Sequence, residues 1–256
     1  MAGKWVLITG ASQGIGYELT RLFAQDGYDL VLVARDRERL AQVSDELKTR
    51  HRVNVKVLAK DLAVPGASRE IFEDLSREQV PVSILVNNAG FGFQGPFVAH
   101  ELQRELDLIQ VNVTALVELS RLFLPPMLAR REGRILNVAS TAAFQPGPFM
   151  ALYYASKAFV YSFSCALAEE VSGSGVTVTA LCPGLTRSQF HARAGLKRPG
   201  GILMMEADKV ARIGYRALMR GKPIVIAGVL NKLASAGAKA APTRLAARVA
   251  RKFNEP

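Results

Sequence analysis

A glycine-rich turn between an apolar run and a helical pattern constrains this chain most. Lys4–Thr9 is short and largely apolar, and glycines follow at Gly10, Gly14 and Gly16. Glycines so placed permit a tight turn, a close approach of backbone to a pyrophosphate and tight packing of helix on strand. A turn without a ligand is the alternative. The position directly between a strand and a helix favours a nucleotide-binding loop, in which the helix N-terminus faces the phosphates.

Strand-like and helix-like stretches then alternate along the chain. The helical patterns include 14–26, 37–50, 102–129 and 152–172. The predicted strands are Lys4–Thr9, Asp29–Ala34, Val53–Ala59, Val82–Val86, Arg134–Val138, Val176–Cys182 and Pro223–Ala227. Such alternation is typical of a parallel sheet covered on both faces. We therefore expect an α/β fold, a Rossmann-like doubly wound sheet of about seven mainly parallel strands.

Charge divides the chain unevenly. Residues 186–256 hold 15 of the 33 basic residues but only 3 of the 22 acidic ones. We expect residues 1–228 to form one dinucleotide-binding and catalytic domain, and 229–256 to be a basic extension. No apolar run reaches the roughly 18–20 residues that span a bilayer. The first apolar run resembles a strand more than a signal peptide, which favours a cytoplasmic location.

The end of the extension has the pattern of a cationic amphipathic helix. Leu245, Val249 and Phe253 recur every four residues after Pro242, among the basic residues Arg244, Arg248, Arg251 and Lys252. Such a helix can rest on an anionic membrane surface as a peripheral contact. Packing on the protein body or on a neighbouring subunit is an equal alternative. Nucleic-acid binding is disfavoured because no recognised binding module accompanies the charge.

The end of the second predicted strand bears on the choice of nicotinamide cofactor. An NAD site usually has an acid there, bonded to the ribose 2′-hydroxyl. This strand instead ends in Ala34 and Arg35, and an arginine pairs well with a 2′-phosphate. Asp36 follows directly and weakens the argument, and Arg35 starting a solvated helix is the alternative. We expect NADP(H), with NAD(H) less favoured.

A tyrosine and a lysine one helical turn apart are the candidate catalytic pair. Tyr153 and Lys157 lie four residues apart, so one helix face carries both. A neighbouring ammonium is expected to lower the pKa of the phenol, which then exchanges a proton with a carbonyl or alcohol oxygen. Such a pair alone more often decorates a helix surface. Ser140, at a strand end thirteen residues earlier, and Asn112, inside a helical pattern, strengthen it.

These motifs, in this order and spacing, resemble the short-chain dehydrogenase/reductase family over residues 3–227. The loop matches its Thr-Gly-x-x-x-Gly-x-Gly pattern, and Asn112, Ser140, Tyr153 and Lys157 match its catalytic tetrad. The resemblance implies that Tyr153 is the general acid/base and Lys157 tunes it and holds the nicotinamide ribose. Ser140 then polarises the substrate oxygen, and Asn112 holds a relay water. Tyr154 is the rival acid, but its spacing to Ser140 is one residue too long.

The resemblance also implies the cofactor contacts. Arg35 and Ser12 would meet the 2′-phosphate, Asp61 the adenine, and Thr186 the carboxamide. The full expected set is Gly10, Ser12, Gly14, Ile15, Gly16, Arg35, Asp61, Leu62, Asn88, Ala89, Gly90, Tyr153, Lys157, Pro183, Gly184 and Thr186. Three scattered histidines give no reason to expect a metal site. Family members are often homodimers or homotetramers.

We expect a carbonyl reductase or alcohol dehydrogenase acting on a small hydrophobic substrate. A β-ketoacyl thioester reductase and a non-catalytic nucleotide-binding regulator are the alternatives. Residues 187–205 resemble the segment that covers the substrate, with Arg187, Arg193, Lys197 and Arg198 available to an anionic group. The other candidate wall residues are Phe91, Phe93, Phe144, Phe149, Met150, Phe190, Leu196, Ile202, Leu203, Met204 and Met205.

Overall fold

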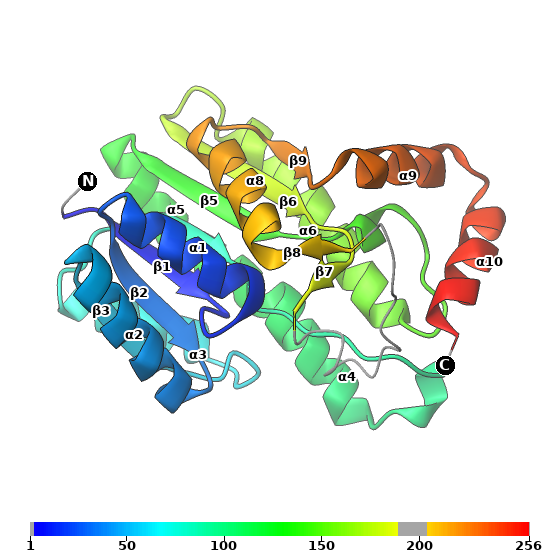
Figure 1. The fold of residues 1–256 in the computed structure, drawn as a ribbon, viewed down its shortest axis with the longest axis horizontal. Coiled ribbons are helices and arrows are strands. Elements are labelled where there is room, and N and C mark those ends of the chain that lie inside the picture. The colour runs from blue at the N-terminus through cyan, green and yellow to red at the C-terminus, as the bar shows by residue number, and fades with distance from the viewer. Residues whose placement is uncertain (1–2, 189–203, 256) are drawn as a thin grey trace.

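The computed structural model describes residues 3–188 and 204–255, in which a central sheet lies between two layers of helices (Figure 1). The seven strands pair in the order β3-β2-β1-β4-β5-β6-β9, and every pairing is parallel. The doubly wound parallel sheet predicted from the sequence is confirmed. The strands are β1 (Trp5–Thr9), β2 (Asp29–Ala34), β3 (Val55–Ala59), β4 (Val82–Asn87), β5 (Gly133–Val138), β6 (Val176–Cys182) and β9 (Ile224–Ile226).

Both faces of the sheet are buried because successive strand residues point to opposite helix layers. In β1, Val6 and Ile8 pack with one layer and Leu7 with the other, and all three are fully buried. The first layer is α1 (Gly14–Gln25), α2 (Arg37–His51) and α8 (Ala207–Met219). The second is α3 (Ala67–Arg77), α5 (Ala115–Arg130) and α6 (Ala151–Glu170).

The strand order creates a crevice at the carboxyl edge of the sheet. The chain first builds outward from β1 to β3 and then returns to place β4 on the other side of β1. The connections after β1 and β4 therefore leave in opposite directions, and ligands of such sheets bind at that point. The predicted loop at Gly10 and the Asn-Asn-Ala-Gly segment (residues 87–90), which holds the predicted contacts Asn88, Ala89 and Gly90, lie on its two sides.

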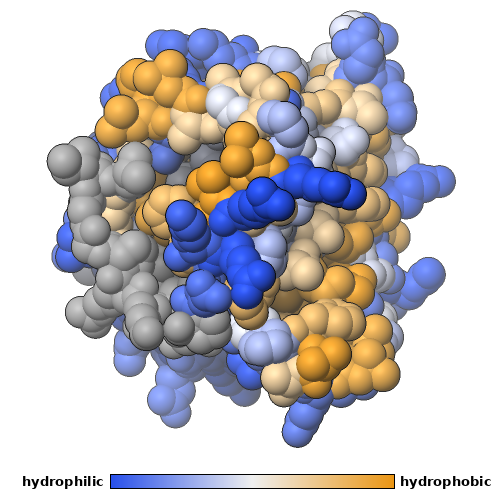
Figure 2. All heavy atoms as spheres, turned by 90° about the vertical axis from the view of Figure 1, so that its right-hand side faces the viewer, coloured by the Kyte–Doolittle hydropathy of each residue, from blue (hydrophilic) through white to orange (hydrophobic). Residues whose placement is uncertain are grey.

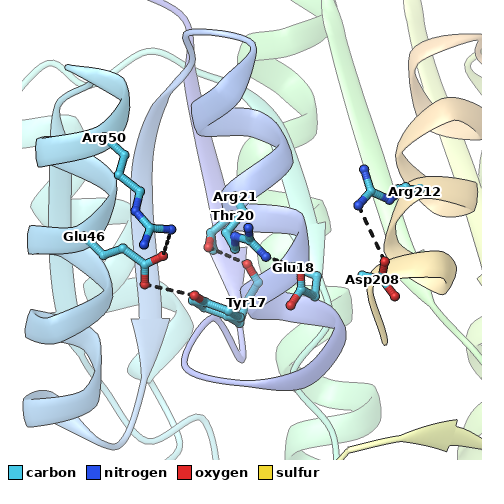
Figure 3. Close-up of polar contacts among 8 residues, drawn as sticks. All are labelled: Tyr17, Glu18, Thr20, Arg21, Glu46, Arg50, Asp208 and Arg212. Atoms are coloured by element: carbon cyan, nitrogen blue, oxygen red, sulfur yellow. Dashed lines mark hydrogen bonds and ion pairs between the residues drawn. The ribbon is translucent and has the colours of Figure 1, made fainter. Parts of the chain in front are cut away.

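Polar contacts join α1 to α2 beside this crevice (Figure 3). The Tyr17 hydroxyl donates to Glu46 Oε2 at 2.9 Å, and Glu46 also pairs with Arg50 at 2.9 Å. Tyr17 in turn lies under the guanidinium of Arg39, 5.5 Å from the ring centroid. These contacts fix the start of α2 relative to the glycine loop.

The single helix predicted over 102–129 is interrupted. It consists of α4 (Leu102–Ile109), a π-helical turn η2 (Gln110–Thr114) and α5. Such wide turns occur mostly at functional sites, and here the turn carries the buried Asn112. By length and composition this run is apolar enough to cross a membrane. In the structure α5 packs against α3, β4 and β5, as a core helix does.

Two helices follow the last strand and lie beyond the carboxyl edge of the sheet, at the right in Figure 1. The predicted helix after Pro242 is confirmed as α10 (Thr243–Asn254). The alanine-rich stretch before it, for which we predicted no helix, forms α9 (Val229–Ala240). Alanine is the strongest helix former, which outweighs one interior glycine. The remaining elements are η1 (Phe97–Ala99), η3 (Thr141–Phe144), β7 (Thr186–Arg187) and β8 (Met205–Glu206).

A buried polar network ties the sheet to its second helix layer. Asn87 Nδ2 on β4 donates to Asn137 Oδ1 at 2.9 Å and to Ser120 Oγ at 3.1 Å. Asn137 Nδ2 on β5 donates to Ser164 Oγ at 2.9 Å. All four side chains are buried, so the polar atoms joined by these bonds depend on one another rather than on water.

We expect Asn137→Ala to lower the free energy of unfolding by about 2–3 kcal/mol, because one buried N–H of Asn87 and the buried Ser164 oxygen each lose a hydrogen-bond partner. Urea denaturation followed by circular dichroism measures this change. Ser120→Ala removes one bond of the same network and should cost only about 1 kcal/mol. Equal stability of the Asn137→Ala variant and the parent would contradict the role given to the network.

Candidate active site

A cavity of about 1090 Å³ occupies the carboxyl edge of the sheet. The segments that follow β1, β2, β4, β5 and β6 line it, together with α6, α9 and α10. Every predicted catalytic or cofactor-contacting residue lines this cavity except Gly16 and Asn112. Those two stand directly behind its wall.

The glycine loop has the geometry that a phosphate cradle needs. Gly10 and Gly14 have φ of +65° and +57°, which L side chains rarely adopt. A Cβ on Gly16 would lie 2.2 Å from the carbonyl oxygen of Gly10, so only glycine permits this packing. Helix α1 begins at Gly14 with no side-chain cap from Gln13 and no acid in its first turn. An anion suits such a helix start.

The end of β2 carries one exposed arginine beside the cavity. Arg35 lines it and lies 3.8 Å from Asp61, measured from Nη1 to Oδ2. The carboxylate of Asp36 caps α2 by accepting a hydrogen bond from Arg39 N at 2.9 Å. Asp36 therefore has a structural partner of its own. Arg39 Nε also donates to Ser12 O at 3.4 Å, a second cation near the loop that the sequence analysis did not single out.

Hydrogen bonds hold the strand ends at the crevice together. Thr9 Oγ1 accepts from the backbone N–H of Asn88 and of Ala89, both at 2.9 Å. Asn88 Nδ2 donates to Thr9 O at 2.9 Å and to Gly10 O at 3.2 Å. Asn88 thus has a structural function at the glycine loop, and it places the Asn-Asn-Ala-Gly segment against the cavity.

Helix α6 presents Tyr153 and Lys157 on one face, inside the cavity wall. The Lys157 ammonium lies 5.9 Å from the centroid of the Tyr153 ring and donates to Val138 O at 2.9 Å. Ser140 follows β5, and its hydroxyl is hydrogen-bonded to the Tyr153 phenol. Ser140 Oγ also accepts from Ala142 N at 3.1 Å, which orients the hydroxyl. The structure brings these three predicted residues together.

Asn112 supports this arrangement from behind. Its Oδ1 accepts from Phe91 N at 3.0 Å, and its Nδ2 donates to Phe91 O at 2.9 Å and to Ser156 Oγ at 3.1 Å. A Cβ on Gly90 would lie 3.0 Å from Asn112 Oδ1 and 3.3 Å from Lys157 Nζ. Gly90 therefore leaves the space in which the amide and the ammonium approach one another. Ser156, which joins Asn112 to α6, was not anticipated.

Burial dominates the titration of the catalytic pair. It raises the pKa of Tyr153 to about 12, against the opposing effect of the Ser140 hydrogen bond. Burial also lowers the pKa of Lys157 to about 8. The expectation that Lys157 lowers the phenol pKa is therefore wrong for the protein alone, where the ammonium donates to Val138 O. A phenol with this pKa stays protonated at neutral pH and can donate a proton.

Of the described residues predicted to surround the substrate, only some line the cavity. Phe91 and Met150 line the cavity, as does Leu185. Phe93 and Phe144 are buried, and Arg187 pairs with Glu206 at 2.9 Å. Phe149, Met204 and Met205 are not among the described lining residues. The predicted positions Phe190, Arg193, Leu196, Lys197, Arg198, Ile202 and Leu203 lie outside the described part of the chain.

The C-terminal helices supply a wall that the sequence analysis missed. α10 packs Ala246, Ala250 and Asn254 against the protein body. Packing on the body was one of the two alternatives predicted for the basic extension. Its apolar residues Leu245, Val249 and Phe253 line the cavity. Their four-residue spacing was visible in the sequence, but nothing there showed which surface the stripe would meet.

Comparison with known proteins gives the family. The model of the short chain dehydrogenase family matches residues 4–198, and the chain belongs to that family. It is 38% identical over 238 residues to a 17-beta-hydroxysteroid dehydrogenase type 3 of Mus musculus, covering 91% of this chain and 77% of that protein. It is 35% identical over 187 residues (71% of this chain) to a very-long-chain 3-oxoacyl-CoA reductase of Anas platyrhynchos, and spans 59% of that protein's length.

Among solved structures, a short-chain dehydrogenase from Sphingobium yanoikuyae in complex with NADPH superimposes with a TM-score of 0.84. It is 35% identical, and the match covers 91% of this chain and 93% of that one.

Proposed function

We propose that the protein reduces an apolar ketone or aldehyde to an alcohol with NADP(H), with Tyr153 as the proton donor. The observation that carries this proposal is the position of the Tyr153 phenol, which is hydrogen-bonded to Ser140 in the wall of the cavity that begins at the glycine loop. The NADPH bound by the Sphingobium yanoikuyae relative supports the choice of cofactor. The carbonyl-reducing relatives support the choice of reaction.

The cavity fits a dinucleotide phosphate along its length. The glycine loop and the start of α1 would hold the pyrophosphate, because backbone N–H groups and the helix dipole face it. Arg35, with Arg39 nearby, would meet the 2′-phosphate, and Lys157 the nicotinamide ribose. A bound NADPH supplies the hydride.

The side chains then handle the proton and the developing charge. Ser140 would donate a hydrogen bond to the carbonyl oxygen and polarise it. Tyr153 would transfer its proton to that oxygen as the carbon becomes tetrahedral. Ser140 is buried and Tyr153 is half-buried in the cavity wall, so water competes less for these contacts than it would on the open surface. Asn112 would act as a positioning residue, because its amide holds Phe91 and Ser156 beside Lys157.

The first prediction separates the two neighbouring tyrosines. Tyr153→Phe should lower kcat for NADPH-dependent reduction of a small ketone such as cyclohexanone by about 10²–10⁴-fold, because the proton donor is lost. Tyr154→Phe is the matched control and should keep near-normal turnover of that ketone. Near-normal turnover by Tyr153→Phe would contradict the assignment of the acid.

A second prediction concerns the cofactor. Arg35→Leu should raise KM for NADPH by about tenfold or more and leave KM for NADH within about twofold, since only NADPH carries the phosphate that a charge-assisted bond recognises. Arg37→Leu removes an exposed arginine of the same turn that does not line the cavity, and it should change neither value. Equal losses with both cofactors would count against a 2′-phosphate site.

A third prediction follows from the Lys157 pKa of about 8. The ammonium is charged below that pH and neutral above it, so its contact with the ribose weakens as pH rises. We expect kcat/KM for NADPH to be level below about pH 7, to be halved near pH 8 and to fall by about tenfold per pH unit above about pH 9, as one deprotonation requires. Stopped-flow measurement at saturating ketone tests this, and a level profile to pH 10 would contradict it.

A β-ketoacyl thioester is the second candidate substrate class. The similarity to a ketoacyl reductase, HetN of Nostoc, at 30% identity over 95% of this chain supports it. A reductase assay with a bulky ketone and a β-ketoacyl thioester, each with NADPH and NADH, separates the two classes and a non-catalytic role. Homo-oligomer formation, peripheral membrane contact and a cytoplasmic location stay predictions.

A further inference from the structure

Residues 229–255, α9 and α10 with their connection, are called here the C-terminal strap. The strap closes one side of the cavity beyond the carboxyl edge of the sheet (Figure 1). Both of its helices contribute to the lining. The lining residues include Gly237, Ala238, Ala241, Leu245, Val249 and Phe253. An extension that only exposed its charged side chains to water would not line so much of this cavity.

One attachment point holds α9. Lys239 Nζ lies 4.5 Å from the centroid of the Phe144 ring and 4.9 Å from that of Tyr161. The same ammonium donates to the Tyr161 hydroxyl at 3.1 Å. Ammonium groups over aromatic faces are attracted by the ring quadrupole. The contact fixes α9 to η3 and α6, which also carry the residues around Ser140 and Tyr153.

A second attachment point holds the end of α10, beside the catalytic tyrosine. Asn254 is buried, and its Oδ1 accepts from the Tyr154 hydroxyl at 3.2 Å. Its Nδ2 donates to Pro148 O at 3.1 Å, and its backbone oxygen accepts from Gln94 Nε2 at 2.7 Å. Tyr154, the rival acid in the sequence, thus latches the strap while Tyr153 faces Ser140. The residue next to the proton donor therefore contacts the strap directly.

The strap lines the cavity with small or apolar side chains and with the amides of Asn231 and Asn254, and it turns the charges of α10 outward. Arg244, Arg248, Arg251 and Lys252 belong to α10, and none of them lines the cavity. Figure 2 looks onto this side of the molecule, where deep blue side chains separate orange patches on the outer surface. Between the two attachment points, Gly237 leaves open space: a Cβ there would meet no atom within 4 Å. An uncharged wall with such a gap suits a bulky apolar group.

We propose that the C-terminal strap is the specificity wall of the active site and that Gly237 makes room for a bulky, uncharged ketone. The proposal rests on the proposed reductase function and names its substrate class. Leu245, Val249 and Phe253 would contact the apolar body of the substrate. The Asn254–Tyr154 latch would hold that wall at the right distance from Tyr153, so Asn254 is a positioning residue.

The test fills the open space beside Gly237 with a substitution that should not destabilise the fold. Gly237→Leu adds a side chain to open space and replaces a poor helix former by a good one, which favours α9 by about 1 kcal/mol. Ala236→Leu adds bulk to an exposed neighbour that does not line the cavity, and it serves as the matched control. Each variant of the full chain is assayed with NADPH, once with cyclohexanone and once with a four-ring polycyclic ketone.

Gly237→Leu should lower kcat/KM for the polycyclic ketone by about tenfold or more, as expected for lost fit in an apolar pocket, and leave cyclohexanone within about twofold. Ala236→Leu should change neither value. Equal effects of Gly237→Leu on both ketones, or no effect on either, would overturn the proposal. Failure of the unaltered protein to reduce any carbonyl would instead overturn the proposed function, so the two failures are distinguishable.

The latch has its own test. Asn254→Leu keeps the number and branching of the side-chain heavy atoms and removes both side-chain hydrogen bonds. We expect KM for the polycyclic ketone to rise by about fivefold or more, with kcat and the cyclohexanone constants within about twofold, since the wall moves and the proton donor does not. Unchanged KM would overturn the positioning role of Asn254. A loss of kcat on both ketones would assign the strap to catalysis or folding rather than to specificity.

Discussion

The hydroxyl of Thr9 holds together the two strand ends on which the site depends. It accepts two backbone hydrogen bonds from the start of the Asn-Asn-Ala-Gly segment, while Asn88 returns two bonds to the end of β1 and the glycine loop. A doubly wound sheet opens a crevice between these strands. The bonds set its width on the β1 side and bring Gly90 to the point where Asn112 and Lys157 approach one another. The phosphate cradle and the proton donor therefore share one frame.

Burial explains why the pKa values of Tyr153 and Lys157 shift as they do. The same desolvation moves the two pKa values in opposite directions, keeping the phenol protonated and easing deprotonation of the ammonium. In the proposed reaction the protonated phenol then serves as the proton donor, without direct contact with the ammonium. The Ser140 hydroxyl, which accepts a hydrogen bond from Ala142 N, is also hydrogen-bonded to this phenol.

The sheet and the grouping of the candidate catalytic residues could be predicted because they depend on local patterns. Strand and helix periods, the glycines of the loop and the spacing of Ser140, Tyr153 and Lys157 all lie within short stretches of sequence. The π-helical turn around Asn112 could not be predicted, since it depends on hydrogen bonds to Phe91, twenty-one residues away. The strap was missed for the same reason: Asn254 meets Tyr154 across one hundred residues. The direction of the Tyr153 pKa shift could not be predicted either, because it depends on burial, which a helical wheel does not show.

The central claim is that this chain delivers a hydride from NADPH to a carbonyl carbon while Tyr153 protonates the oxygen. The most direct measurement uses NADPH deuterated at C4 of the nicotinamide, on each face in turn, with the polycyclic ketone as substrate. Mass spectrometry of the alcohol should find one deuterium on the carbinol carbon for one of the two faces. An alcohol without deuterium from either cofactor, or no alcohol at all, would contradict the account.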